Sequence, residues 1–346
     1  MTVPSVSVIV PCRNERAHIG ACLDALLATT YPHERLEILV VDGMSDDGTR
    51  QILAQYAARH PIIRLLDNER RITPTALNLG VLNSRGEILM PIGAHNESPP
   101  EYIPTLVRHL TERGADNVGG VLLTEPGGSG PVAHAIAIAM AHPFGVGNSM
   151  FRIGVTEPRW VDTVPFGCYR RQVFDRIGLF DEDLIRNQDD ELNLRLVRMG
   201  GRILLVPDVV SRYYARGSLG KTWRMYYQYG YFKPLVIRKV GAVLTCRQLV
   251  PGAFVAALVV GAVLSAISSI GRWMLAAVVA AYLIALVVAI APSVRRYGVA
   301  RSLCLTAAFP VLHLSYGSGF LRGACDFLVL RRGGVRGPSE TVTMSR

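Results

Sequence analysis

Two short stretches of the chain carry side chains that could bind a metal ion or move a proton. The first spans residues 93–97 and contains His95 and Glu97, directly after the apolar run at 88–92. Imidazole and carboxylate groups are common ligands of divalent cations. A short polar segment in front of Pro99 can equally cap the helix that begins there. The stretch alone therefore leaves a metal site and a helix cap both open.

The second stretch is an acidic run ahead of an apolar helical pattern: Gln188, Asp189, Asp190 and Glu191. On a helix, Asp189 lies beside Leu192 and Leu196. Glu191 lies beside Arg195, with which it can form an ion pair. A carboxylate held by a packed helix is suited to general-base catalysis. The helix macrodipole also favours acids at a helix start, but it does not account for three in a row against an apolar face.

The apolar pattern around these stretches predicts alternating strands and helices. Strands are expected at residues 6–10, 36–41, 62–66, 88–92, 116–123 and 202–206, and helices at 16–28, 74–83, 100–113 and 133–141, with another ending at 56. Such alternation with short connections is typical of a parallel, doubly wound α/β sheet, because parallel neighbours need crossover helices. Ligands bind at the carboxyl edge of sheets of this kind.

Polar side chains stand at the ends of three of these strands. Glu15 follows the first, Asp42 the second, and His95 and Glu97 the fourth. The chain has neither a GxGxxG nor a GxxxxGK[ST] motif, so a glycine-rich phosphate loop is excluded. A nucleotide at this edge would therefore be held by side chains.

Composition divides the 346-residue chain near residue 248. Upstream, charged and apolar segments alternate as in a soluble enzyme, whereas Ala, Val, Leu and Ile dominate downstream. The formal net charge is +10, and many basic residues flank the apolar segments: Arg238, Lys239, Arg247, Arg295, Arg296, Arg301, Arg331 and Arg332. This placement favours an anionic membrane surface over nucleic acid, which would need basic residues interleaved with aromatics on one face.

Two uncharged runs, Leu249–Ile270 and Trp273–Ala291, are long enough to cross about 30 Å of hydrocarbon. The short link at 271–272 makes them a hairpin. A third run, Ser302–Leu321, is expected to be re-entrant or interfacial. A full span there would place the basic C-terminal end outside, against the positive-inside rule.

Several separated motifs, in the same order and spacing, resemble the family 2 glycosyltransferases of the GT-A fold. They are Val8–Glu15, Val40–Thr49, Asn78–Gly80, Pro99–Tyr102 and Val164–Gly167. The last two narrow the resemblance to the succinoglycan-biosynthesis type. The resemblance covers residues 6–231 and implies an α/β GT-A (Rossmann-like) domain followed by a helical membrane domain.

The resemblance implies a donor site for a nucleotide-diphosphate sugar. Pro11 and Glu15 would line the nucleoside pocket, and Asp42 would accept hydrogen bonds from the base or ribose. The alternative for Asp42 is a turn residue that bonds its own backbone. Arg70 and Arg71 stand where the family brings a basic side chain to the diphosphate, and their alternative is a solvated surface pair.

The acidic run resembles the family motif Glu-Asp-x-Asp/Glu-Leu-x-x-Arg, with Gln188 in place of the first Glu. Asp189 would then be the general base, with Asp190 or Glu191 able to take part of its task. Glu191, Arg195 and Gln188 would support the acceptor side. One base without a covalent nucleophile implies a single displacement with inversion at the sugar. The Gln-x-x-Arg-Trp motif of processive synthases is missing, which favours transfer of one sugar.

The family's metal motif falls at residues 93–97, where Gly93 replaces the expected first Asp. His95 matches a known variant of the motif. We hypothesise that His95 and Glu97 together replace the lost carboxylate and bind Mg²⁺ or Mn²⁺ more weakly. If they do not, the chain could instead be a metal-impaired pseudo-transferase that acts as a scaffold partner in an exopolysaccharide complex.

These patterns predict four parts: a cytosolic catalytic domain at 1–215, an interfacial amphipathic linker at 216–248, transmembrane or re-entrant helices at 249–330 and a basic polar tail at 331–346. Six cysteines without paired spacing (Cys12, Cys22, Cys168, Cys246, Cys304 and Cys325) indicate small buried side chains in a reducing compartment. No signal peptide is recognisable at the N-terminus. We expect a multi-pass protein of the cytoplasmic (inner) membrane, with a lipid-linked saccharide acceptor, membrane lipids as partners and no nucleic acid.

Overall fold

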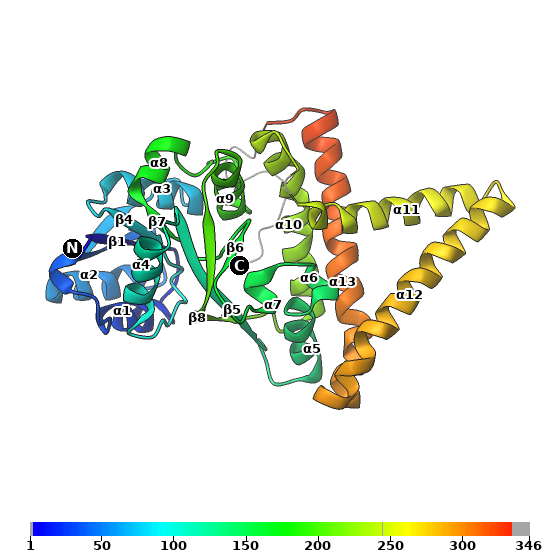
Figure 1. Ribbon diagram of the computed structural model, residues 1–346, viewed down its shortest axis with the longest axis horizontal. Helices are drawn as coiled ribbons and strands as arrows, with labels where there is room; N and C mark the ends of the chain where they lie inside the picture. The colour runs from blue at the N-terminus through cyan, green and yellow to red at the C-terminus, as the bar shows by residue number, and fades with distance from the viewer. Residues whose placement is uncertain (1–2, 244, 334–346) are drawn as a thin grey trace. The chain divides into compact units, whose positions relative to one another are not determined.

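The computed structural model describes residues 3–243 and 245–333 (Figure 1). They form two compact units. The first comprises Met1–Leu122 and Gly154–Arg212, and the second Leu123–Ile153 and Tyr213–Arg346. The chain passes from the first unit to the second after Arg212, close to the predicted boundary at 215. Residues 123–153, however, belong to the second unit with the C-terminal helices. From residue 334 on, the predicted polar tail lies outside the described residues.

The first unit begins with four parallel strands in the order β3-β2-β1-β4. Their bounds are β1 Val6–Cys12, β2 Leu36–Asp42, β3 Ile63–Asp67 and β4 Ile88–Pro91. These strands are rich in β-branched and aliphatic residues, and β1 and β2 are buried almost throughout, as expected for a parallel sheet covered on both faces. The predicted positions of all four strands are confirmed.

The other half of the eight-stranded sheet was predicted to be parallel, but it contains antiparallel pairs. It continues β7-β5-β8-β6, with bounds Cys168–Arg170, Asn117–Glu125, Ile203–Tyr214 and Arg159–Val161. β7 runs antiparallel to both β4 and β5. A three-residue strand that is reached through a loop gives no periodic signal, and this is why β6 and β7 were missed.

β8 is also longer than predicted, since it runs through Pro207 to Tyr214. A proline normally ends a central strand because it lacks the N–H donor. Here β6 pairs only with residues 203–205 of β8. Pro207 therefore lies past the end of that neighbour, where no donor to it is needed.

Six α-helices connect these strands: α1 Ile19–Leu27, α2 Thr49–Arg59, α3 Thr73–Asn83, α4 Tyr102–Glu112, α8 Arg171–Ile177 and α9 Gln188–Arg198, besides a 3₁₀ turn at His33–Arg35. α4 illustrates how they pack. Ile103, Leu106 and Leu110 recur at helical spacing and are buried in the core against the sheet. Each such side chain contributes about 1.5–3 kcal/mol through burial.

The second unit is helical: α5 Pro131–Met140, α6 Pro143–Val146, α7 Met150–Ile153, α10 Leu219–Val240, α11 Val250–Ser265, α12 Ser269–Tyr297 and α13 Val299–Gly323, with a 3₁₀ turn at Cys246–Gln248 and a π-helical continuation at Ala324–Val329. Its core brings small apolar residues of α5 against Phe309 and Leu312 of α13. This packing explains why residues 123–153 join the C-terminal helices. The predicted linker at 216–248 is mostly α10, which packs along α13.

Glycines allow the backbones of α10 and α13 to touch. A Cβ added at Gly230 would lie 2.0 Å from the Tyr316 carbonyl oxygen, and one at Gly319 would lie 2.1 Å from that of Tyr227. Gly323 meets Tyr231 in the same way, at 2.0 Å. Small residues four apart that permit such contact are typical of helix pairs in membranes.

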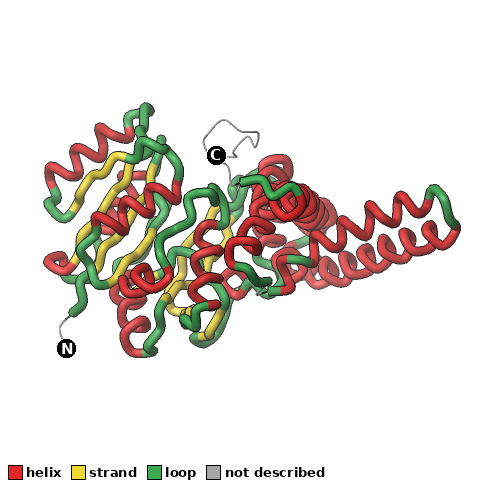
Figure 2. Tube along the Cα trace, turned by 90° about the horizontal axis from the view of Figure 1, so that it is seen from above, coloured by secondary structure: helices red, strands yellow, loops and turns green. Residues whose placement is uncertain are grey.

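Within residues 3–243 and 245–333, three helical stretches are long and apolar enough to cross a membrane: Cys246–Ser265, Ser269–Tyr297 and Val299–Val329. α11 and α12 form the predicted hairpin and lead away from the α10–α13 pair in both views (Figures 1 and 2). Its turn lies at 266–268, earlier than predicted, because the Ser268 hydroxyl accepts from the N–H groups of Ile270 and Gly271 and so caps α12. The third stretch is a single helix from Val299 to Gly323 with a π-helical continuation, and its expected re-entrant or interfacial position stays a prediction.

Candidate active site

The carboxyl ends of β1, β2 and β3 are level with one another. Cys12 is in register with Asp42, and Asp42 with Asp67. β4 lies on the other side of β1, where the N–H of Ile92 donates to the Ile9 carbonyl at 2.9 Å. β1 is thus the point at which the strand order reverses, the usual position of a ligand site in such sheets.

The loop after β1 is fixed to the loop after β2 by paired hydrogen bonds. The Asn14 side-chain amide donates to Asp46 at 2.9 Å, while the Asp46 N–H donates back to the Asn14 oxygen at 3.0 Å. The Glu15 N–H donates to the Thr49 hydroxyl at 2.9 Å. These contacts hold the Glu15 backbone at the edge of the sheet.

Asp42 is buried and already has several donors. It accepts from the Ser45 N–H at 3.0 Å, from the Ser45 hydroxyl at 2.5 Å and from Arg50 at 2.8 Å. Arg50 also binds Asp67 at 2.9 Å. The turn interaction considered as the alternative for Asp42 is therefore present. Its predicted contact with a nucleoside remains a prediction, and Arg50 is a site residue that local spacing did not reveal.

Cys12 lies beside Asp42, with Sγ 3.7 Å from its Oδ1. Burial, followed by the charge of Asp42, raises the pKa of the Cys12 thiol well above its usual range. The thiol therefore stays protonated and inert. Cys12, Cys22 and Cys168 are buried as predicted, but Cys246 and Cys325 are exposed.

His95 is exposed, and its Nε2 lies 2.9 Å from Oε2 of Glu15. The His18 ring packs against the His95 ring, with centroids 4.3 Å apart. Glu97 is also exposed on the same turn. The donor types fit Mn²⁺ or Mg²⁺. However, residues 3–243 and 245–333 contain no group of three or more His, Cys, Asp or Glu side chains that could hold a metal, so a cation here would need further ligands.

Gly93 lies under an aromatic ring. A Cβ at this position would be 3.4 Å from Cε1 of Phe166, an ordinary van der Waals distance. Phe166 belongs to the segment before β7, so this contact brings the 163–167 segment to the end of β4. The Val164–Gly167 motif, which the resemblance singled out, therefore lies beside the end of β4.

Backbone strain is concentrated in the same loops. Outside glycine, positive φ occurs at Asn14 (56°), Met44 (58°), Arg71 (59°), Phe166 (46°), Asn187 (63°) and, elsewhere, Arg331 (50°) among the described residues. The first three lie in the loops that follow β1, β2 and β3, and Asn187 directly precedes α9. Such strain persists only where the surroundings fix it, and it clusters at functional sites.

α9 presents its three acids differently. Asp189 is exposed, Asp190 is half-buried and Glu191 is buried. Both Glu191 oxygens accept from Arg195 at 2.8 Å, and Arg195 also donates to the carbonyl oxygens of Ile177 and Leu179. The predicted i,i+4 pair is confirmed. It fixes α9 to the end of α8 and leaves Asp189 facing solvent.

A buried amide secures the opposite face of α9. Oδ1 of Asn193 accepts from the Asn117 amide and from the Tyr169 hydroxyl, each at 2.9 Å. Its Nδ2 donates to the Thr163 hydroxyl at 3.0 Å and to the Val164 carbonyl at 3.1 Å. Burial first, and then the charge of Asp189, raise the pKa of Tyr169. The exposed carboxylate therefore lies close to this network.

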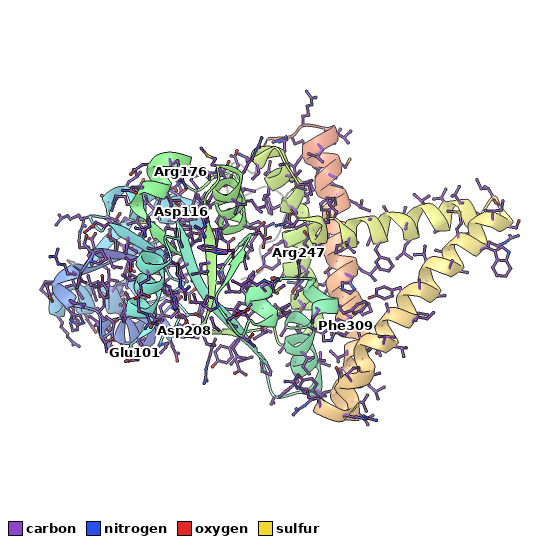
Figure 3. The ribbon with its side chains drawn as sticks, in the orientation of Figure 1. Glu101, Asp116, Arg176, Asp208, Arg247 and Phe309 are labelled. Atoms are coloured by element: carbon purple, nitrogen blue, oxygen red, sulfur yellow. The ribbon has the colours of Figure 1, made fainter. Side chains whose placement is uncertain are left out.

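The two arginines after β3 have different surroundings. Arg70 forms an ion pair with Glu182, whose other oxygen accepts from Asn78 at 3.0 Å. Arg71 is exposed. The Arg70 side chain is thus engaged by Glu182, so Arg71 is the better candidate to reach a diphosphate. Elsewhere in the unit, ion pairs such as Arg176–Asp116 at 3.1 Å join α8 to the start of β5 (Figure 3).

Comparisons with known proteins agree on one family. Residues 7–178 match the family model "Glycosyl transferase family 2". The succinoglycan biosynthesis protein ExoA of Rhizobium meliloti (strain 1021) is 32% identical, over 94% of this chain and 97% of its own length. A dolichyl N-acetyl-alpha-D-glucosaminyl phosphate 3-beta-D-2,3-diacetamido-2,3-dideoxy-beta-D-glucuronosyltransferase of Methanococcus voltae is 30% identical, over 68% of this chain and 74% of its own.

The fold agrees as well. The mannosyltransferase PcManGT from Pyrobaculum calidifontis, solved with GDP-Man and Mn²⁺, superimposes with a TM-score of 0.55 at 22% identity, over 93% of this chain and 85% of that one. The predicted GT-A fold with a C-terminal helical membrane domain is confirmed. With its three apolar helices, the protein is a membrane protein. The chain belongs to glycosyl transferase family 2.

Proposed function

We propose that the protein is a membrane-anchored, inverting glycosyltransferase that moves one sugar from a nucleotide-diphosphate sugar to a lipid-linked acceptor. One observation carries the proposal: a family 2 domain and three membrane-capable helices lie on one chain. The Methanococcus voltae relative is named for a dolichyl phosphate-linked substrate. A polyprenyl-diphosphate-linked saccharide suits a transferase that is held at the membrane.

The donor would lie at the carboxyl ends of β1 and β2. Pro11 and Glu15 would flank the nucleoside, and Asp42 would accept from its base or ribose. To do so, a nucleoside would share Asp42 with Ser45 and Arg50. This pocket chemistry needs no glycine-rich loop.

Transfer would be a single displacement. The Asp189 carboxylate removes the proton from the acceptor hydroxyl, and that oxygen forms its bond to the anomeric carbon. The bond from this carbon to the diphosphate oxygen breaks, and the nucleoside diphosphate leaves with the electron pair. Attack from the face opposite the leaving group inverts the anomeric centre. Asp190 is the nearest substitute base, because Glu191 is bound by Arg195 and Gln188 cannot accept a proton.

The leaving diphosphate must be neutralised. A divalent cation bound at His95 would supply that charge as a Lewis acid. The Arg71 guanidinium is a further candidate, since phosphate oxygens accept bidentate hydrogen bonds from arginine. Gly93 adds no ligand.

The membrane helices set the expected orientation. With the catalytic domain in the cytosol, the α11–α12 hairpin leaves and returns to the cytosolic side. Arg295 and Arg296, at the end of α12, then satisfy the positive-inside rule.

The proposal is tested with purified full-length protein in detergent, incubated with a panel of nucleotide sugars and a bacterial lipid extract. We expect one donor to give a single-sugar glycolipid whose new linkage has the opposite anomeric configuration to the donor. No transfer from any donor would count strongly against the proposal. Donor binding without turnover, even with excess Mg²⁺ or Mn²⁺, would favour the scaffold alternative.

A further inference from the structure

The loss of a carboxylate at position 93 raises the question of which group replaces it. Position 93 offers only a backbone, and the Phe166 ring lies over it. Any carboxylate that reaches a cation at the end of β4 must therefore come from a neighbouring residue or from another element. Glu97 comes from the same loop, whereas Glu15 comes from the loop after β1.

We propose that Glu15 and His95 are the two protein ligands of the donor-site divalent cation in this chain. The inference rests on the proposed function and deepens it. It replaces the nucleoside-binding role expected of Glu15 with a cation-binding role, and it leaves Glu97 outside the ligand set.

The first argument is geometric. Oε2 of Glu15 and Nε2 of His95 are 2.9 Å apart. Two ligands at right angles, each about 2.1 Å from an octahedral cation, are about 3.0 Å apart. The pair therefore has the separation of two adjacent ligands without any movement of either loop.

The second argument is rigidity. The Glu15 N–H is bound by Thr49, and its carbonyl accepts from the N–H groups of His18 and Ile19 at 2.9 Å each, which begins α1. Asn14, directly before it, is locked to Ser45 and Asp46. The Glu15 carboxylate thus starts from a fixed backbone, as a preorganised ligand requires.

The third argument is chemical. One carboxylate oxygen and one imidazole nitrogen suit Mn²⁺, whereas Mg²⁺ strongly prefers oxygen. Two protein ligands leave several positions of an octahedron for diphosphate oxygens and water. We therefore expect nucleoside diphosphate to strengthen Mn²⁺ binding, and Mn²⁺ to bind better than Mg²⁺.

The decisive comparison is between Glu15→Gln and Glu97→Gln, two matched changes that remove one carboxylate charge each. Mn²⁺ binding to the full-length protein in detergent is followed by electron paramagnetic resonance, alone and with GDP or UDP. We expect Glu15→Gln and His95→Gln to weaken Mn²⁺ binding by at least about 10-fold. Glu97→Gln should leave Mn²⁺ binding at the wild-type level, because Glu97 is outside the proposed ligand set.

A second measurement separates cation binding from nucleoside binding. In EDTA, GDP and UDP affinities of Glu15→Gln should match those of wild type, because the cation is then absent from both. An equal loss of nucleotide affinity in EDTA and in Mn²⁺ would assign Glu15 to the nucleoside and overturn the proposal. So would Mn²⁺ binding that depends on Glu97 but not on Glu15.

Failure of the proposed function would look different. A wild-type protein that binds neither nucleotide nor nucleotide sugar would refute a donor site. The titration with Mn²⁺ alone would still decide whether Glu15 and His95 bind the cation. Unchanged far-ultraviolet circular dichroism and elution volume establish that the variants, all at partly or fully exposed positions, are folded.

Discussion

At the scale of single residues, Asp189→Asn tests the general base. The amide keeps the shape of the side chain but cannot take the acceptor proton, so kcat should fall by about 100- to 10,000-fold. Donor affinity, measured by titration calorimetry, should stay unchanged. Asp190→Asn is the matched control and should retain most activity. If Asp190→Asn instead loses more activity than Asp189→Asn, the general base is Asp190.

Local spacing predicted the residue pairs that lie within one helix and missed those that join distant segments. Glu191 and Arg195 are one helical turn apart, so their ion pair follows from the sequence. The contact of Glu15 with His95, and that of Arg50 with Asp42, depend on which strands become neighbours and on how each loop turns. Sequence position alone fixes neither.

At the scale of elements, the strands of the parallel half were predictable because each is a continuous apolar run. The antiparallel half was not. Its two three-residue strands are too short to show the alternation of apolar and polar residues that marks a strand. Pro207 was interpreted as the end of a strand that in fact continues to Tyr214. Asn193 was missed for a related reason: it is a polar residue on a buried helix face, and its four partners come from β5, β7 and the 163–167 segment.

Glu37 links three strands and sets an acid limit on stability. It accepts from the Ser7 hydroxyl at 2.6 Å, from the Arg85 N–H at 2.5 Å and from Arg64 at 2.9 Å. Burial alone would raise the pKa of Glu37, but these hydrogen bonds outweigh it and hold the pKa below its usual range.

The pKa of Glu37 is lower in the folded protein than in the unfolded chain, where it is about 4.3. Its contribution to the free energy of unfolding is therefore present above that pH and is lost as pH falls through the folded pKa. We expect Glu37→Gln to reduce the free energy of unfolding at pH 7 by about 1–3 kcal/mol. The gap to wild type should close under acid. Thermal unfolding between pH 3 and pH 7 checks this, and a gap that persists at the acid end would contradict it.

Because glycines allow α10 and α13 to touch, two Gly→Ala substitutions within α10 should have different effects on stability. Gly230→Ala places a methyl group against a backbone carbonyl that cannot move aside, and should destabilise the second unit by about 3 kcal/mol. Gly220→Ala, also in α10, meets no atom within 4 Å. It should leave stability unchanged or slightly higher, since alanine favours helix. Melting temperatures in detergent compare the two, and equal effects would refute backbone contact.

At the scale of the whole molecule, composition located the change from a mixed to an apolar chain but not the division into units. Residues 123–153 contain an apolar helix, Pro131–Met140, that is too short to cross a membrane, and its sequence does not indicate which helix it packs against. That packing depends on small side chains meeting Phe309, a match between two surfaces far apart in sequence.

Membrane topology is testable with two exposed native cysteines and one added residue. Ile267→Cys, at the hairpin turn, should react with an impermeant maleimide in intact cells, whereas Cys246 should react only after lysis. Cys325, in the π-helical segment that follows α13, distinguishes a re-entrant or interfacial third segment from a third full span. We expect it to be protected, as for an interfacial helix, and labelling in intact cells would show a third full span.

The backbone contact between α10 and α13 also constrains the order in which the protein can mature. Domains form as the ribosome delivers them, from the N-terminus onward. α10 emerges before the α11–α12 hairpin, yet the surface that covers Gly230 belongs to α13, which emerges after it. α5 is made earlier than α10 and packs against the same helix, α13. Until α13 has been made, α10 and α5 lack the helix against which they pack, so we expect the second unit to complete its packing last.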